Sequence, residues 1–260
     1  MPATGRIKAC DARTEGSESA VSARFEELDW RPTPLGTISL RRRLDPVLGA
    51  DVYEVKLDDE FLMSSVFTEA EIQVAALALA ELTGTDLDVV VGGLGLGYTA
   101  QTVLDDSRVG SLIVVDAIAE VIDWHERGLV PVSVSSLSDA RCRLVLGDFF
   151  AMVGETGFDP DAKDRRFDAI IVDIDHSPRH VLNPGNAAFY EPAGVAMLAS
   201  RLHPGGMFSL WSNDPPDDEY LAVLSDVFVD VRAEVISFRN PLQGRDSTNT
   251  VYLARRPIEA

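Results

Sequence analysis

The chain has 260 residues, 46% of them hydrophobic, which is enough to bury one full core with a small appended unit. Its 42 acidic and 23 basic residues give a formal net charge of −19. Such a surface repels phosphate backbones and anionic lipid and attracts cations, so we expect neither nucleic acid nor a membrane as partner. Two cysteines, the lack of a membrane-length apolar run and the lack of an apolar signal core predict a cytoplasmic protein without a disulfide framework.

The first quarter of the sequence predicts two regions ahead of the main domain. Residues 1–30 begin polar and mixed in charge, and we expect them to form a mobile tail. Short extended pieces separated by turn residues follow over residues 31–66 and predict a small N-terminal β-hairpin unit. Thr68 and Glu71 have the spacing of a capping box, so we expect residues 67–260 to form the main domain, opening with a helix that runs to Gly84.

From Leu87 onward, apolar strands alternate with helical segments, which predicts a mostly parallel sheet with helices on both faces. The predicted strands are residues 87–91, 111–116, 143–146, 167–173 and 207–212. The predicted helices are residues 99–105, 118–127, a short piece after Phe149, 187–202 and a segment around 219–228. Two final β-rich runs, 227–238 and 249–256, are close enough in sequence to pair antiparallel. The fold class is therefore α/β.

A glycine-rich turn, VVVGGLGLGYTA, joins the first strand of this domain to its helix. The glycines of this turn let bare backbone approach a ligand, and they are Gly92, Gly93, Gly95 and Gly97. The start of the following helix adds free N–H groups at the same place. Tyr98 stands where the dinucleotide fingerprint G-x-G-x-x-G needs its third glycine, which argues against a nicotinamide oxidoreductase. The G-x-G-x-G spacing is instead typical of S-adenosylmethionine-type folds, although a packing turn without a ligand would read the same way.

Acidic residues follow the next two predicted strands, at the edge where open α/β sheets bind ligands. Asp116 comes about 20 residues after the glycine turn, the distance at which a carboxylate reaches ribose hydroxyls. Asp148 is a candidate for an adenine amino group, with Phe149 packing on the base. Either carboxylate could instead only cap the helix that follows it.

Asp173, Asp175 and His176 follow the fourth strand in DAIIVDIDHSP and are candidates for a reaction centre. Asp173 could accept a proton from an attacking amine or hold the cationic form of that amine. His176 is a competing base, because its reference pKa lies near neutrality. His176 and His180 are four residues apart, but Pro178 argues against a regular helix between them, so no metal site is expected.

Over roughly residues 52–255 these motifs resemble the spermidine synthase family, the polyamine aminopropyltransferases. GGLGLG resembles the family's GGGDGG turn, VVDAIAEVI its ribose-binding strand end, LGDFF its adenine contact and FDAIIVDIDHSP its catalytic segment. The resemblance implies a Rossmann-like class I methyltransferase fold, that is, a doubly wound sheet with a terminal antiparallel pair. It also implies that Asp116 holds ribose, Asp148 holds adenine and Asp173 is the catalytic carboxylate.

Three departures from the family bear on activity. Gly95 stands where the family's turn carries an aspartate that holds the aminopropyl ammonium of decarboxylated S-adenosylmethionine. Because that carboxylate would repel the carboxylate of intact S-adenosylmethionine, its loss favours the intact donor and methyl transfer, with aminopropyl transfer as the alternative. Met63, Ser64 and Ser65 occupy the region of the family's Tyr-His-Glu, and Trp211 stands where the family often has glutamine.

The sequence therefore predicts a transferase that moves an alkyl group from a sulfonium nucleoside to a small amine or other cationic acceptor. Tyr190, Phe189 and Trp211 are candidates for closing the substrate side, although each could instead fill the core. A nucleoside-binding regulatory protein without catalysis is the alternative from a different class. The N-terminal β unit is a candidate surface for a homodimer.

Overall fold

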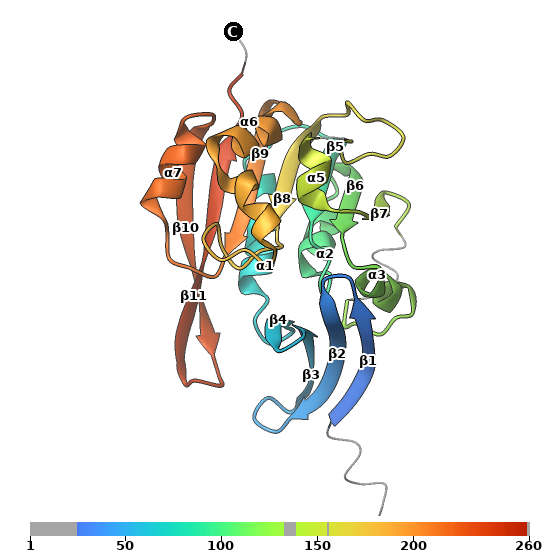
Figure 1. Cartoon of the computed structure of the whole chain (residues 1–260). Helices are drawn as coiled ribbons and strands as arrows, with labels where there is room; N and C mark the ends of the chain where they lie inside the picture. The colour runs from blue at the N-terminus through green and yellow to red at the C-terminus, as the bar shows by residue number, and fades with distance from the viewer. Residues whose placement is uncertain (1–24, 133–138, 155, 259–260) are drawn as a thin grey trace, which may run out of the picture.

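The N-terminal part of the fold begins earlier than the sequence indicated. The computed structural model (Figure 1) describes residues 25–132, 139–154 and 156–258. Most of the predicted tail lies outside the described residues. Strand β1 begins at Phe25, so residues 25–30, which we expected to belong to the tail, are in a strand that pairs antiparallel with the next one.

The predicted small N-terminal β unit is present as a four-stranded antiparallel sheet. Its strands are neighbours in chain order: β1 (Phe25–Thr33), β2 (Gly36–Asp45), β3 (Ala50–Leu57) and β4 (Glu60–Ser64). Ile38, Leu40 and Val55 are almost fully buried and share one apolar cluster with Val74 of the first helix and Leu94 of the glycine turn. The small sheet therefore packs against the main domain beside that turn.

A seven-stranded sheet forms the main domain, with the spatial order β10-β11-β9-β8-β5-β6-β7. The strands are β5 (Leu87–Gly92), β6 (Val109–Asp116), β7 (Cys142–Leu146), β8 (Phe167–Val172), β9 (Leu202–Ser212), β10 (Val229–Asn240) and β11 (Arg245–Arg255). Strands β5 to β9 run parallel, and β11 runs antiparallel to both β9 and β10. The predicted α/β fold with a terminal antiparallel pair is confirmed. The chain order reverses between β5 and β8, which is the usual ligand position in such sheets.

Helices cover both faces of this sheet, as the alternating pattern predicted. They are α1 (Glu69–Ala80), α2 (Tyr98–Asp105), α3 (Ala119–Glu126), α5 (Phe149–Gly154), α6 (Pro192–Ser200) and α7 (Asp218–Ser225). Helices α1 to α3 share one buried cluster with Val89 and Val91 of β5, whereas α5 to α7 share the other with Val90. Because successive residues of β5 are buried on opposite faces, the strand reads as an uninterrupted apolar run.

The predicted helix over residues 187–202 is two separate elements. A 3-10 helix, η2 (Pro184–Tyr190), ends where Glu191 adopts an extended conformation, and α6 starts at Pro192. Proline disfavours helical geometry in the residue before it, which explains the break. Strand β9 begins at Leu202, so the His-Pro-Gly-Gly segment expected to close the helix already lies in the strand.

The capping box predicted at the start of α1 is wrong. The side chain of Thr68 makes no capping hydrogen bond, and its backbone N–H bonds to Glu69 instead. Glu71 is buried on the inner face of the helix, which ends at Ala80 rather than at Gly84. No helix in the described part of the chain has the length and apolar character needed to cross a membrane.

Candidate active site

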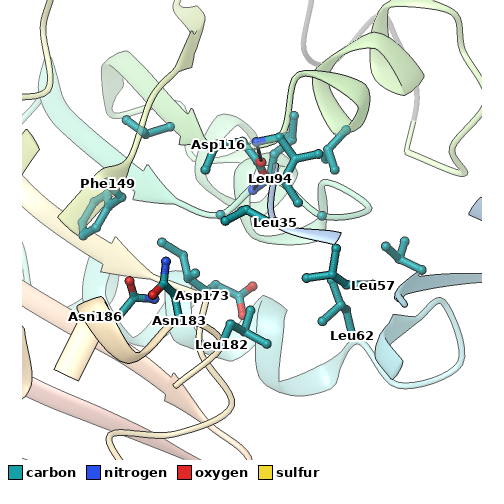
Figure 2. A pocket seen from close by; sticks show the side chains of 18 of the residues that line it. Leu35, Leu57, Leu62, Leu94, Asp116, Phe149, Asp173, Leu182, Asn183 and Asn186 are labelled. Carbon is teal, nitrogen blue, oxygen red and sulfur yellow. Dashed lines mark hydrogen bonds between the residues drawn. The ribbon is translucent and has the colours of Figure 1, made fainter. Parts of the chain in front are cut away.

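A cavity of about 440 Å³ lies between the carboxyl ends of β5, β6 and β8 and the N-terminal sheet (Figure 2). Most of the predicted site residues line it, namely Gly93, Gly95, Asp116, Asp148, Phe149, Asp173, His176 and Trp211. Five predicted residues are not among those that line it: Gly92, Gly97, Asp175, Phe189 and Tyr190. Its size is within the range of pockets that hold small molecules.

The glycines of the turn serve close packing as much as ligand access. A side-chain carbon on Gly92 would lie 2.6 Å from the ring of Phe149, and one on Gly93 would lie 2.1 Å from the backbone oxygen of Asp173. Gly97 precedes α2 with a φ of +93°, in the left-handed region that favours glycine. Gly92 and Gly97 are therefore explained by packing and backbone conformation, while Gly93 and Gly95 border the cavity.

Gly95 is covered by Met63 from strand β4. A side-chain carbon on Gly95 would lie 2.5 Å from the Met63 sulfur, and that sulfur accepts a hydrogen bond of 3.1 Å from the backbone N–H of Leu96. The position where the resembling family carries an aspartate is thus occupied by a thioether from the N-terminal sheet.

Asp116 and Asp148 both shape the backbone around the cavity. One oxygen of Asp116 accepts from the N–H of Leu94 at 3.0 Å, and the other accepts from Ile118 at 2.8 Å. Burial raises the pKa of Asp116, and these N–H groups act in the opposite direction. One oxygen of Asp148 accepts from Phe150 and Ala151, so it caps α5. A carboxylate has about four acceptor positions, so capping leaves both residues able to bind a ligand, and their ribose and adenine roles stay predictions.

Two carboxyl groups, the buried Glu71 and the half-buried Asp173, lie on the other side of the cavity. The Thr99 hydroxyl is 2.7 Å from Asp173 Oδ2 and 3.1 Å from the backbone oxygen of Glu71, and it has only one proton to donate. Burial raises the pKa of both carboxyl groups, and the charge of Asp173 adds to the rise at Glu71. The pair therefore resists carrying two negative charges unless a cation binds next to it.

Glu71 is the site residue that the sequence analysis missed. The sequence analysis assigned Glu71 to a capping box. Its helical spacing was also informative, because positions 71, 74, 75 and 78 form one face of a helix and the last three are apolar. A glutamate on the apolar face of a helix is seldom buried without a partner or a function. The helical spacing could have identified it.

Asp175 and Tyr190 do not have the positions expected of them. Asp175 is 1% exposed. Its carboxylate accepts hydrogen bonds from the N–H of Leu182 at 2.7 Å, the side-chain amide of Asn186 at 2.9 Å and the Tyr190 hydroxyl at 2.8 Å. Burial raises the pKa of Tyr190 well above its usual value. Together they fix the segment after β8, which presents Leu182, Asn183 and Asn186 to the cavity.

His176 and Trp211 both line the cavity, and their catalytic and substrate roles stay predictions. His176 Nε2 lies 2.9 Å from Glu60 Oε1, which ties the loop after β8 to strand β4. The ring N–H of Trp211 is buried without a hydrogen-bond partner among the described residues. His180 pairs with Asp214 instead, and in the described ranges no three His, Cys, Asp or Glu side chains are grouped as metal ligands.

The sheet order and the position of the cavity define the class of protein: a Rossmann-like fold of the class I methyltransferase type with an N-terminal β-sheet. Within that class the chain has a spermidine synthase-like fold. Spermidine synthase from Thermotoga maritima and a spermidine synthase in complex with the transition state analogue AdoDATO each superimpose with a TM-score of 0.69 at 18% identity, over 90% of this chain and 74% of theirs.

A probable spermidine synthase from Corynebacterium glutamicum has the same fold, with a TM-score of 0.61, 18% identity and coverage of 87% of this chain and 79% of its own. No protein-family model matches the sequence. At this level of identity the likeness establishes the architecture alone, and the chemistry depends on the residues of the site.

Proposed function

We propose that the protein is an aminopropyltransferase-type enzyme, which moves an alkyl group from a sulfonium nucleoside to an amine. The observation that supports this most is the carboxyl pair Glu71 and Asp173 in the same cavity as Asp116 and Asp148. Two neighbouring carboxyl groups stabilise an ammonium group, and one of them can take the proton that the amine loses. The fold shared with spermidine synthases agrees with this reading.

The donor is better matched by decarboxylated than by intact S-adenosylmethionine. Among the described lining residues of the cavity there is neither lysine nor arginine. Four of them carry carboxyl groups, namely Glu71, Asp116, Asp148 and Asp173. The carboxylate of the intact donor would meet like charges without a lysine or arginine to offset them. The absence of an aspartate at Gly95 is the observation that favours methyl transfer, which we retain as the second candidate.

The nucleoside fits one part of the cavity, which we call the nucleotide end and define by Asp116, Asp148, Phe149 and Phe150. The two aspartates offer acceptors for hydroxyl and amino groups, and the two phenylalanines offer ring faces. When bound, the sulfonium supplies an electrophilic carbon: the amine nitrogen bonds to it as the C–S bond breaks, and that electron pair goes to sulfur. Asp173 accepts the amine proton, with Thr99 fixing its orientation. Glu71 adds the second negative charge that holds the ammonium form before the proton leaves.

Binding and turnover test this proposal in sequence. Calorimetry with decarboxylated S-adenosylmethionine, the intact form and methylthioadenosine identifies the donor, and we expect the decarboxylated form to bind at least about tenfold tighter than the intact one. Tighter binding of intact S-adenosylmethionine would favour methyl transfer instead. Release of methylthioadenosine with a panel of amines then reports catalysis. Tight nucleoside binding without product from any amine would instead support the regulatory alternative.

Asp173→Asn separates catalysis from binding. We expect kcat to fall about 10²–10⁴-fold, because the amine loses its proton acceptor, while methylthioadenosine still binds. Asp161→Asn is the matched control, since the Asp161 side chain is 80% exposed and lies on the surface. An Asp173→Asn protein with unchanged kcat would remove Asp173 from the proposed mechanism.

A further inference from the structure

The cavity continues past Asp173 into a space with apolar walls. In Figure 2, Phe149 and Asn186 lie on one side of the Asp173 carboxylate, whereas Leu57 and Leu62 lie on the other. We call this second space the leucine compartment and define it by its lining residues Leu35, Ile38, Val55, Leu57, Leu62 and Leu182. All but Leu182 come from the N-terminal sheet, including the turn that joins β1 to β2.

The negative charges of the cavity are gathered at its other parts. Asp116 and Asp148 accept hydrogen bonds from backbone N–H groups at the nucleotide end, and Glu71 and Asp173 form one pair. Glu60 does not line the cavity and is hydrogen-bonded to His176. The leucine compartment itself contributes no carboxylate from the described residues.

This distribution offers one site for an ammonium group and an apolar surface beyond it. We propose that the amine acceptor is a monoamine with an apolar tail, whose nitrogen lies at Glu71 and Asp173 and whose tail fills the leucine compartment. The inference rests on the proposed function and adds the substrate class. A diamine of the same length would have to place its second ammonium against leucine side chains, which is unfavourable without a partner. Each methylene buried there strengthens binding about fourfold.

Matched pairs of amines test the inference directly. Hexylamine and hexamethylenediamine have the same chain length and differ only in the second amino group, and butylamine and putrescine form a shorter pair. With saturating decarboxylated S-adenosylmethionine, we expect kcat/KM for each monoamine to exceed that of its diamine by at least about tenfold. Hexylamine should exceed butylamine by about fifteenfold, because it buries two more methylenes. A diamine that equals or exceeds its monoamine overturns the inference.

A variant of strand β4 tests the role of the wall. Leu62→Asp gives the leucine compartment a carboxylate, so we expect hexamethylenediamine to gain at least about tenfold relative to hexylamine. Phe61→Asp is the control, because Phe61 is 44% exposed and does not line the cavity, and it should leave the ratio unchanged. If Leu62→Asp does not fold, Leu62→Ala should lower kcat/KM for hexylamine more than for butylamine.

The outcomes distinguish this inference from the function on which it rests. Methylthioadenosine release with diamines in preference to monoamines would leave the transferase proposal standing and refute the apolar acceptor. An unchanged ratio in Leu62→Asp and Leu62→Ala would also refute it. No release with any amine, in the presence of bound nucleoside, would refute both.

Discussion

At the scale of single residues, the carboxyl group of Glu71 is the feature that changes the interpretation most. Its burial on α1 raises its pKa, and Asp173 raises it further. In the unfolded chain the same group ionises at an ordinary carboxyl pKa. The folded protein therefore holds this proton more tightly than the unfolded chain does. The resulting stability is full below the unfolded pKa and is lost as pH rises through the raised folded value.

Glu71→Gln should remove this pH-dependent loss. The amide is neutral like the protonated acid, so we expect the variant without ligand to be more stable than the parent at about pH 9 by on the order of 1 kcal/mol. That corresponds to about 2–4 °C in a chain of this size, and the difference should shrink toward about pH 5. Thermal unfolding over that pH range measures it. A constant difference at every pH would mean that Glu71 is not the titrating group.

Gly95 and Met63 form a second pair whose effects should be coupled. Gly95→Asp alone places a side chain against the Met63 sulfur, and we expect a loss of about 1–3 kcal/mol from overpacking. The φ of +46° at Gly95 lies in the left-handed region, so the substitution adds backbone strain to the clash. Met63→Ala in the same chain should recover the part of the loss that comes from the clash.

Unfolding of the single and double variants closes this cycle. The double variant, with space and a carboxylate at position 95, should also bind decarboxylated S-adenosylmethionine more tightly than the parent does. Equal losses in Gly95→Asp with and without Met63→Ala would contradict the contact between the two positions.

At the scale of elements, the segment from β8 to α6 depends on one buried carboxylate. Asp175 binds Leu182, Asn186 and Tyr190, and this network places η2 against the cavity. Pro192 then separates η2 from α6. The sequence identified the acidic residues of this segment, but it could not show that Asp173 faces the cavity while Asp175 faces the protein interior.

Tyr190→Phe tests this network. It removes one of the donors to buried Asp175, and we expect the free energy of unfolding to fall by about 1–3 kcal/mol. Tyr220→Phe is the matched control, because the Tyr220 hydroxyl is also buried but has no hydrogen-bond partner among the described residues. Chemical denaturation should show a loss for the first variant and little change for the second. Equal losses would mean that ring packing, rather than the bond to Asp175, matters.

At the scale of the whole molecule, the acidic surface and the acidic cavity both attract cations. The net charge of −19 raises the local concentration of cations, and salt screens this attraction over about 10 Å at 0.1 M ionic strength. We expect KM for an amine acceptor to rise severalfold between about 0.02 and 0.3 M salt, with kcat nearly constant. Steady-state kinetics over that range measures it. If kcat fell with increasing salt while KM stayed unchanged, the salt effect would lie in the chemical step instead.

The sequence by itself determined the α/β alternation, the glycine turn and the acidic strand ends, because strand burial, turn conformation and helix starts are encoded within a few neighbouring residues. Only the tertiary structure decided that Glu71 from α1 meets Asp173 and that Met63 covers Gly95. It also decided that leucines of the N-terminal sheet form one wall of the cavity. These contacts join segments far apart in the chain, and their geometry depends on how the two sheets pack together, which local sequence patterns do not specify.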